Sequence, residues 1–226
     1  MISHKKKFIF IHIPKCAGSS IRDFYFDTPN LDWRTPNYEF LYGWCPKRRI
    51  HLQHATPKEL IETGLISQEE WNSYFKFAFV RNPWDRAYSD YLWIQKDRRV
   101  KGSFFNYLNG IGEFESIMND NTVKYYRGDH LREQVAYVLD KDYVLDFIGK
   151  FENLTSDINK INEKMNFSKV FDVHEKKNTN RFNHYSQFYT GSKKRLVDKK
   201  YFKDINNLGY SFEDKRKGLN LLKKYI

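Results

Sequence analysis

The sequence has few cysteines and no long apolar run. Cys16 and Cys45 are its two cysteines among 226 residues, so no disulfide framework can be built with confidence, and a reducing compartment, the cytoplasm, is expected. An apolar stretch follows three lysines near the start, as in a signal peptide, but Pro14 and Lys15 end it too early. Because no span of roughly 18 apolar residues occurs, we expect no transmembrane helix.

Two common nucleotide-binding signatures are also missing. The pattern G-x-x-x-x-G-K-[ST] does not occur, because Lys15 precedes Gly18 instead of following a glycine. The dinucleotide fingerprint G-x-G-x-x-G is absent, and no clear acidic strand end is placed to hold Mg²⁺. An enzyme that cleaves ATP or GTP is therefore disfavoured, and a P-loop-type nucleotide or small-molecule kinase is kept as the alternative function.

Aromatic side chains and positive charge are abundant. Aromatic residues make up 18% of the chain and hydrophobic residues 40%, which is ample for a core and argues against disorder. The net charge of +11 favours an anionic partner, such as a nucleotide, an acidic glycan, a membrane surface or nucleic acid. Because the aromatics follow apolar strand and helix patterns, we expect them in the core and expect no nucleic-acid partner. No repeat or low-complexity linker occurs, so residues 1–226 are expected to form one domain.

The stretch 8–20, FIFIHIPKCAGSS, reads as a strand, a tight loop and the start of a helix. Four apolar β-formers at 8–11 precede the loop, and an amphipathic pattern begins at Ile21. Such a junction directs backbone N–H groups and a helix N-terminus at one point, which favours a phosphate, and a lysine and two hydroxyls add donors. We expect the loop to bind the terminal phosphate of a nucleotide. Its residues are Pro14, Lys15, Cys16, Ala17, Gly18, Ser19 and Ser20.

A second strand–turn–helix unit begins with the strand expected over 74–80. Its continuous apolar end is typical of a strand buried on both faces. The strand ends at Arg81, after which Asn82 can cap a helix over 84–93 and Pro83 can open it. The other predicted elements are helices starting at Thr56, Ser67 and Ser192, a helix within 130–140, a strand over 143–151 and a loop over 172–191. Strands that alternate with helices indicate an α/β domain with a mainly parallel sheet.

Arg81 is expected at the carboxyl end of that buried strand, where open α/β sheets bind ligands. Ser89 lies two turns into the following helix. A guanidinium fork and a hydroxyl from adjacent segments suit a phosphate monoester. The alternative is that Arg81 merely pairs with Asp85.

Five stretches of the chain resemble carbohydrate sulfotransferases of the heparan sulfate 2-O-sulfotransferase-like group. In order they are HIPKCAGSS, FVRNPWDRAYSDY, HLREQVAYV, FIGKFENL and LVDKKYFKDINNLGYSF, of which the first two are the most specific. The resemblance implies a P-loop-like α/β fold and 3′-phosphoadenosine 5′-phosphosulfate (PAPS) as donor, leaving as PAP. It implies that the loop 14–20 binds the 5′-phosphosulfate and that Arg81 and Ser89 bind the 3′-phosphate.

The expected reaction moves the sulfuryl group to a carbohydrate hydroxyl by in-line displacement. Lys15 is placed to neutralise charge on the bridging and leaving oxygens. A histidine has the pKa to take the hydroxyl proton, and His54 is our choice because it precedes a helix start and lies between the two donor-binding segments. The family resemblance supports it through the string HLQHATPKEL. His51 is the alternate, and an acidic base stays open.

We expect no metal, because no Cys or His partners of His51 and His54 recur at ligand spacing. The net charge is compatible with an acidic oligosaccharide acceptor, but the same charge can serve the anionic donor. The oligomeric state is open. Polar residues of the 172–191 loop are candidates for phosphate contacts: Lys176, Lys177, Asn178, Thr179 and Arg181.

Overall fold

The central feature of the structure, a computed structural model that describes residues 1–26, 31–171 and 181–225, is a four-stranded sheet. Its strand order is β1-β2-β5-β6, with β1 antiparallel to β2 and the other neighbours parallel. The strands are β1 (Ile2–Ser3), β2 (Phe8–Ile11), β5 (Phe75–Val80) and β6 (Phe147–Lys150). A separate ribbon pairs β3 (Trp44–Cys45) with β4 (Ile50–His51).

Apolar side chains fix the register of the parallel strands. Phe10 of β2 faces Phe77 of β5, and their rings stack at a centroid distance of 5.2 Å. Phe79 of β5 pairs with Gly149 of β6, where a Cβ would lie 2.4 Å from the Phe79 ring. A glycine is therefore required at 149, since a larger residue would push β6 away from β5.

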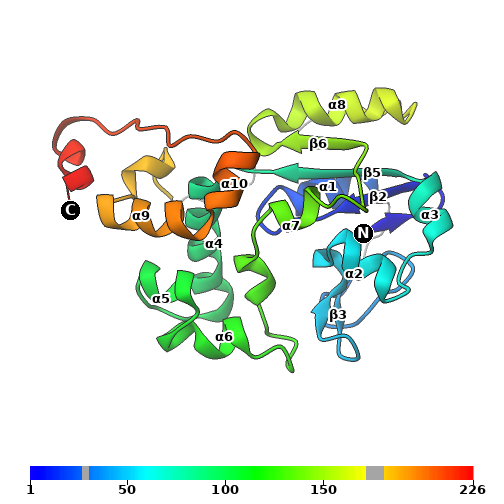
Figure 1. Cartoon of the computed structure of the whole chain (residues 1–226), viewed down its shortest axis with the longest axis horizontal. Coiled ribbons are helices and arrows are strands. Elements are labelled where there is room, and N and C mark those ends of the chain that lie inside the picture. The colour runs from blue at the N-terminus through cyan, green and yellow to red at the C-terminus, as the bar shows by residue number, and fades with distance from the viewer. Residues whose placement is uncertain (27–30, 172–180, 226) are drawn as a thin grey trace.

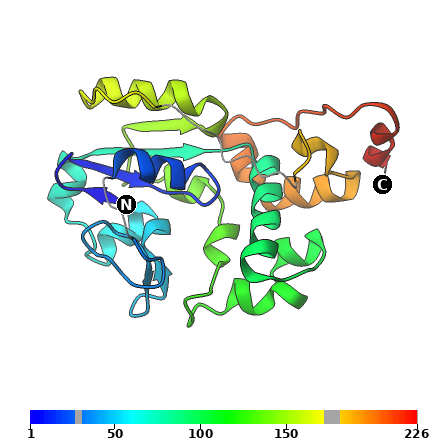
Figure 2. The same cartoon turned by 180° about the vertical axis from the view of Figure 1, so that it is seen from behind.

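Helices flank the sheet, and α7 lies in front of it in Figure 1 whereas α1 lies in front of it in the reverse view of Figure 2. On the sheet side of the molecule are α1 (Gly18–Tyr25), α2 (Pro57–Glu62), α3 (Gln68–Ser73), α7 (Val135–Val138) and α8 (Leu154–Lys164). Beyond the end of β5 are α4 (Pro83–Arg98), α5 (Phe104–Asn109), α6 (Glu115–Asn119), α9 (Gly191–Lys200) and α10 (Phe202–Asn207). The prediction of an α/β fold with a mainly parallel sheet is confirmed.

The core consists of two clusters of buried side chains. One cluster surrounds the sheet and includes all four residues of β2. The other is formed mainly by α4, α5 and α9, with tight stacking such as Tyr88 on Phe188 at 4.3 Å. The carboxyl ends of β2 and β5 lead from the first cluster toward the second, so the loops that follow these strands lie between the two.

Most predicted helix starts are confirmed. Thr56 and Ser67 each form a complete capping box with the glutamate three residues later. Asn82 caps α4 through Trp84 and Asp85, and Pro83 is its first residue. None of the helices in the described parts of the chain has both the length and the apolarity that a membrane crossing requires.

Two helix predictions are wrong. Thr190, not Ser192, caps the last long helix, and the chain then breaks into α9 and α10. In the segment 130–140 only the four residues of α7 are α-helical. Tertiary contacts replace helical hydrogen bonds in this segment. Arg86 donates to two of the segment's carbonyl groups, and Asp204 accepts hydrogen bonds from two of the segment's N–H groups.

Candidate active site

The loop between β2 and α1 has the backbone of an anion site. Lys15 and Ala17 adopt left-handed conformations, with φ of 68° and 66°, which cost roughly 1–2 kcal/mol each in a residue with a Cβ. Ala17 is the N-cap of α1, and no described side chain caps this helix. The first-turn N–H groups of residues 18–20 therefore have no side-chain partner among the described residues, and phosphate binding by them stays a prediction.

Gly18 is required by a close approach within the same loop. A Cβ at this position would lie 1.6 Å from Nε2 of His12, the residue that follows β2. The glycine lets the first turn of α1 lie directly against the His12 ring. The helix start is thereby held next to the end of the strand.

Two buried polar side chains that we did not single out from the sequence hold the loop in place. Gln134 accepts a hydrogen bond from the Arg81 N–H at 2.8 Å, donates to the Arg81 carbonyl at 2.9 Å and accepts from the Cys16 thiol at 3.4 Å. Arg86 donates to the Pro14 carbonyl at 3.1 Å. Burial raises the pKa of Cys16 to about 12, so the thiol stays protonated near neutral pH, where it donates to Gln134.

The Lys15 ammonium lies over the ring of Trp93, 4.8 Å from its centroid. Burial lowers the pKa of Lys15 to about 8, so the ammonium is still mostly charged at neutral pH. Trp93 in turn stacks on the imidazole of His130, with the two rings 4.9 Å apart and inclined by 7°. Lys15 is thus connected through one aromatic ring to a histidine cluster.

Arg81 directly follows β5, and Ser89 lies about two turns into α4, as the sequence predicted. Arg81 is buried, donates to the Lys15 carbonyl at 2.8 Å and forms an ion pair with Asp85 at 2.7 Å. Arg181 also pairs with Asp85 and so reaches the same place. The Asp85 pairing that we weighed as the structural alternative is present, and phosphate binding by Arg81 and Ser89 stays a prediction. Of the other loop residues proposed for phosphate contacts, 176–179 lie outside the described residues.

Four histidines form a cluster beside the loop. The ring centroids of His12 and His54 are 4.6 Å apart, those of His54 and His130 are 5.4 Å apart, and those of His51 and His54 are 6.3 Å apart. Burial lowers the pKa of His51 to about 4 and holds that of His54 well below its usual range. Both rings are therefore neutral near pH 7.

The hydrogen bonds of the two candidate bases differ. Nδ1 of His54 lies 3.1 Å from the His12 carbonyl oxygen, which can only accept, so Nδ1 carries the proton and Nε2 has a free lone pair. Nε2 of His51 lies 2.8 Å from a guanidinium nitrogen of Arg127, which can only donate, and 3.2 Å from the Tyr126 carbonyl oxygen, which can only accept. These two contacts require opposite tautomers of His51, whereas the single carbonyl contact of His54 defines one tautomer with its lone pair on Nε2.

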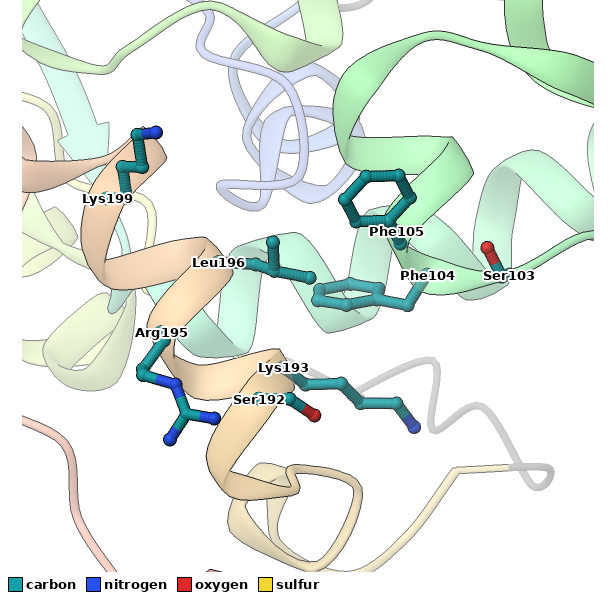
Figure 3. A pocket seen from close by; sticks show the side chains of 8 residues that line it. All are labelled: Ser103, Phe104, Phe105, Ser192, Lys193, Arg195, Leu196 and Lys199. Atoms are coloured by element: carbon teal, nitrogen blue, oxygen red, sulfur yellow. The ribbon is translucent and has the colours of Figure 1, made fainter. Parts of the chain in front are cut away.

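A cavity of about 160 Å³ opens beside His54. Its lining residues are Arg48, Arg49, Ile50, His51, His54, Glu59, Asn121, Tyr126, Asp129 and Arg132. A larger hollow of about 550 Å³ lies between α5 and α9, where Figure 3 shows Phe104, Leu196 and Lys193 among its lining side chains. This hollow shares no residue with the loop 14–20 or the histidine cluster, so we do not assign it to the reaction.

The fold is that of an α/β protein with a glycine-containing loop and a helix N-terminus at the carboxyl end of a mainly parallel sheet. The model of the sulfotransferase family matches residues 1–211, and the chain belongs to this family. It is also 28% identical over 109 residues to an uncharacterized protein of Archaeoglobus fulgidus, a match that covers 48% of this chain and 81% of that protein. No solved structure matches the chain.

Proposed function

We propose that this sulfotransferase moves the sulfuryl group of PAPS to a hydroxyl of a carbohydrate acceptor. The family match supports sulfuryl transfer in general. The donor assignment is supported by the uncapped first turn of α1, the left-handed loop backbone and the buried Lys15 ammonium at the same place. In this proposal residues 14–20 bind the 5′-phosphosulfate, and Arg81 and Ser89 bind the 3′-phosphate.

The observation that carries the proposed mechanism is the hydrogen bond between His54 and the His12 carbonyl. His12 precedes the loop by two residues and its ring packs against Gly18, so the residue that orients the base also contacts the donor-binding segment. The bond also fixes the tautomer with a free lone pair on Nε2, as a general base requires.

The transfer step is an in-line displacement at sulfur. The acceptor oxygen forms a bond to sulfur while the bond from sulfur to the bridging oxygen of the 5′-phosphate breaks. The hydroxyl proton passes to Nε2 of His54, and the electron pair of the broken bond leaves on the phosphate of PAP. Lys15 stabilises that developing charge, which is the electrostatic part of catalysis.

The cavity beside His54 supports an anionic acceptor. Arg48, Arg49 and Arg132 line it together with His54. Arg132 is already paired with Glu59 at 2.8 Å, and Arg48 donates to the Thr63 carbonyl at 2.8 Å but pairs with no carboxylate of the described residues. In this proposal Arg49, with Arg48 beside it, receives an acidic group next to the reacting hydroxyl. A sugar that carries a carboxylate or a sulfate fits this charge better than a neutral one.

A direct test incubates the chain with PAPS and a panel of neutral and acidic oligosaccharides and follows the acceptor by mass. A gain of one sulfuryl group on an acidic sugar is the expected result. The kinase alternative predicts instead that ATP with Mg²⁺ raises the melting temperature while PAP does not, because a ligand stabilises the folded state that binds it. That second result would overturn the proposed function.

A further inference from the structure

Three potential metal ligands converge in the histidine cluster from distant parts of the chain. His54 ends the short 3-10 helix Leu52–His54, and Asp129 and His130 belong to the 3-10 helix Gly128–Leu131. One ligand atom from each of these side chains lies within 4.8 Å of those of the others. This set was not visible in the sequence, because Asp129 and His130 lie far along the chain from His54.

Both imidazoles are already oriented as metal-binding histidines usually are. Nδ1 of His54 faces the His12 carbonyl oxygen at 3.1 Å, and Nδ1 of His130 faces a carboxylate oxygen of Asp90 at 2.7 Å. The Tyr107 hydroxyl donates to the other oxygen of Asp90 at 2.7 Å and holds that carboxylate in place. Such outer hydrogen bonds fix the ring and leave Nε2 as the nitrogen with a free lone pair.

The Asp129 carboxylate is itself a buried group without a hydrogen-bond partner, which is independent evidence for a bound ligand. Its residue is 94% buried, and within the described parts of the chain no hydrogen-bond donor reaches either carboxylate oxygen. A buried carboxylate without a partner is costly, and such groups are normally paired or bound to a metal. The neighbouring Arg132 does not fill this need, because both of its terminal nitrogens bind Glu59.

We propose that His54, Asp129 and His130 bind one Zn²⁺ ion through two imidazole nitrogens and one carboxylate oxygen. Two imidazoles and a carboxylate form a set that suits Zn²⁺ and related first-row ions, whereas Mg²⁺ and Ca²⁺ prefer oxygen ligands only. Zinc bonds of ~2.0–2.2 Å require the three atoms to move somewhat closer together. The cavity of about 160 Å³ is lined by His54 and Asp129 and gives the ion a route and a place for a water ligand.

The proposed metal site is contrary to our expectation from the sequence that the chain binds no metal, and it does not rest on the proposed transfer reaction. The ion would take the same Nε2 lone pair of His54 that the base role uses. Zinc binding and proton transfer to His54 therefore exclude each other in one molecule, and zinc would act as an inhibitor of the transfer.

The test measures zinc binding without any activity assay. The chain is stripped with a chelator and titrated with Zn²⁺ in a calorimeter, beside Asp129→Asn, His130→Gln and the control His4→Gln. His4 is a histidine with a nearby glutamate, Glu70, at 3.3 Å, so the control removes a comparable pair outside the cluster. We expect one equivalent of Zn²⁺ for the wild type and the control, a loss of more than tenfold in affinity for the two cluster variants, and no binding of Mg²⁺.

Co²⁺ in place of Zn²⁺ reports the ligands in the unmodified chain. Nitrogen and oxygen ligands give visible bands without the near-ultraviolet band of a cobalt–thiolate bond. A thiolate band would move the site to Cys16 or Cys45 and overturn the proposal. It would also be overturned by wild-type affinity in folded Asp129→Asn, or by no zinc binding to the wild type.

Discussion

Nδ1 of His54 lies 3.1 Å from the carbonyl oxygen of His12, at the point where β2 passes into the loop 14–20. This contact joins the proposed base to His12, two residues before the proposed donor loop. It also decides the tautomer of His54, since a carbonyl oxygen accepts and does not donate. The role of this contact can be tested by substitutions at His54 and next to His12.

Replacing the proposed base should separate turnover from donor binding. His54→Gln is expected to lower kcat by ~10²–10⁴, the usual contribution of general-base catalysis, with little change in the Kd for PAP. His51→Gln is the matched control, because its Nε2 is engaged by Arg127 and we expect a smaller loss. Steady-state kinetics and calorimetry with PAP check both values. A larger loss of kcat in the His51 variant would transfer the role to His51.

Removing either proposed donor-binding cation should weaken PAP binding. Lys15→Ala removes the ammonium at the loop and Arg81→Ala removes the guanidinium at the end of β5. Each charge-assisted hydrogen bond contributes about 1.5–3 kcal/mol, so we expect roughly a 10- to 100-fold rise in the Kd. Lys47→Ala, at an exposed turn, serves as the control. Unchanged tight binding in both site variants would show that the donor binds elsewhere.

A single added methyl group should disturb the loop. The Cβ of Gly18→Ala would lie 1.6 Å from the His12 ring, and the displaced ring would pull on the carbonyl that orients His54. We expect a loss of about 1–3 kcal/mol in the free energy of unfolding, together with weaker PAP binding. Gly64→Ala has space for the methyl group but a φ of 65°, so it measures the cost of backbone strain alone and should leave PAP binding unchanged. Normal stability and PAP affinity in Gly18→Ala would contradict the described packing.

Gln134 should matter although it touches no substrate in our account. Gln134→Leu keeps the side-chain size but leaves the N–H and carbonyl of Arg81 without their partner. Each unsatisfied buried group costs about 1–3 kcal/mol, so chemical denaturation should show a clear loss of stability. Gln68→Leu, on the exposed helix α3, tests for a general effect of the substitution. Equal stability of the two variants would show that the hydrogen bonds of Gln134 to Arg81 and Cys16 do not stabilise the loop.

The histidine cluster should make stability depend on pH. Burial lowers the pKa of His51 from 6.5 to about 4, and the pKa of His54 is lowered as well. Between pH 6.5 and about 4 the unfolded chain binds a proton at His51 that the folded chain does not bind. The free energy of unfolding therefore decreases as the pH falls through this range. Denaturation at pH 7.0 and 5.0 measures the loss, and His51→Gln should reduce it. An equal loss in that variant would exclude His51 as a contributor.

The elements that carry the loop were predictable because local patterns determine them. The apolar runs of β2 and β5 and the capping boxes at Thr56 and Ser67 act within a few residues. The predicted helix within 130–140 failed because Arg86 and Asp204, from distant helices, take its backbone groups.

The site was predictable where its residues are adjacent in sequence. The loop 14–20 is one such segment, and His54 was chosen from its position near a helix start. Gln134, Asp129 and His130 were missed, because each gains its importance from a contact with a residue far away along the chain. Gln134 lies in a stretch that the sequence predicts to be a helix, and a polar residue on the buried face of such a helix can indicate a structural hydrogen bond. The convergence of Asp129 with His54 is visible only in the folded chain.

The most direct test of the central claim is a crystal structure of the chain with PAP. The account predicts the 5′-phosphate at the N–H groups of residues 18–20 with the Lys15 ammonium in hydrogen-bonding range. It predicts the 3′-phosphate at Arg81 and Ser89. Phosphates bound elsewhere, for example in the hollow between α5 and α9, would contradict the assignment of the loop as the donor site.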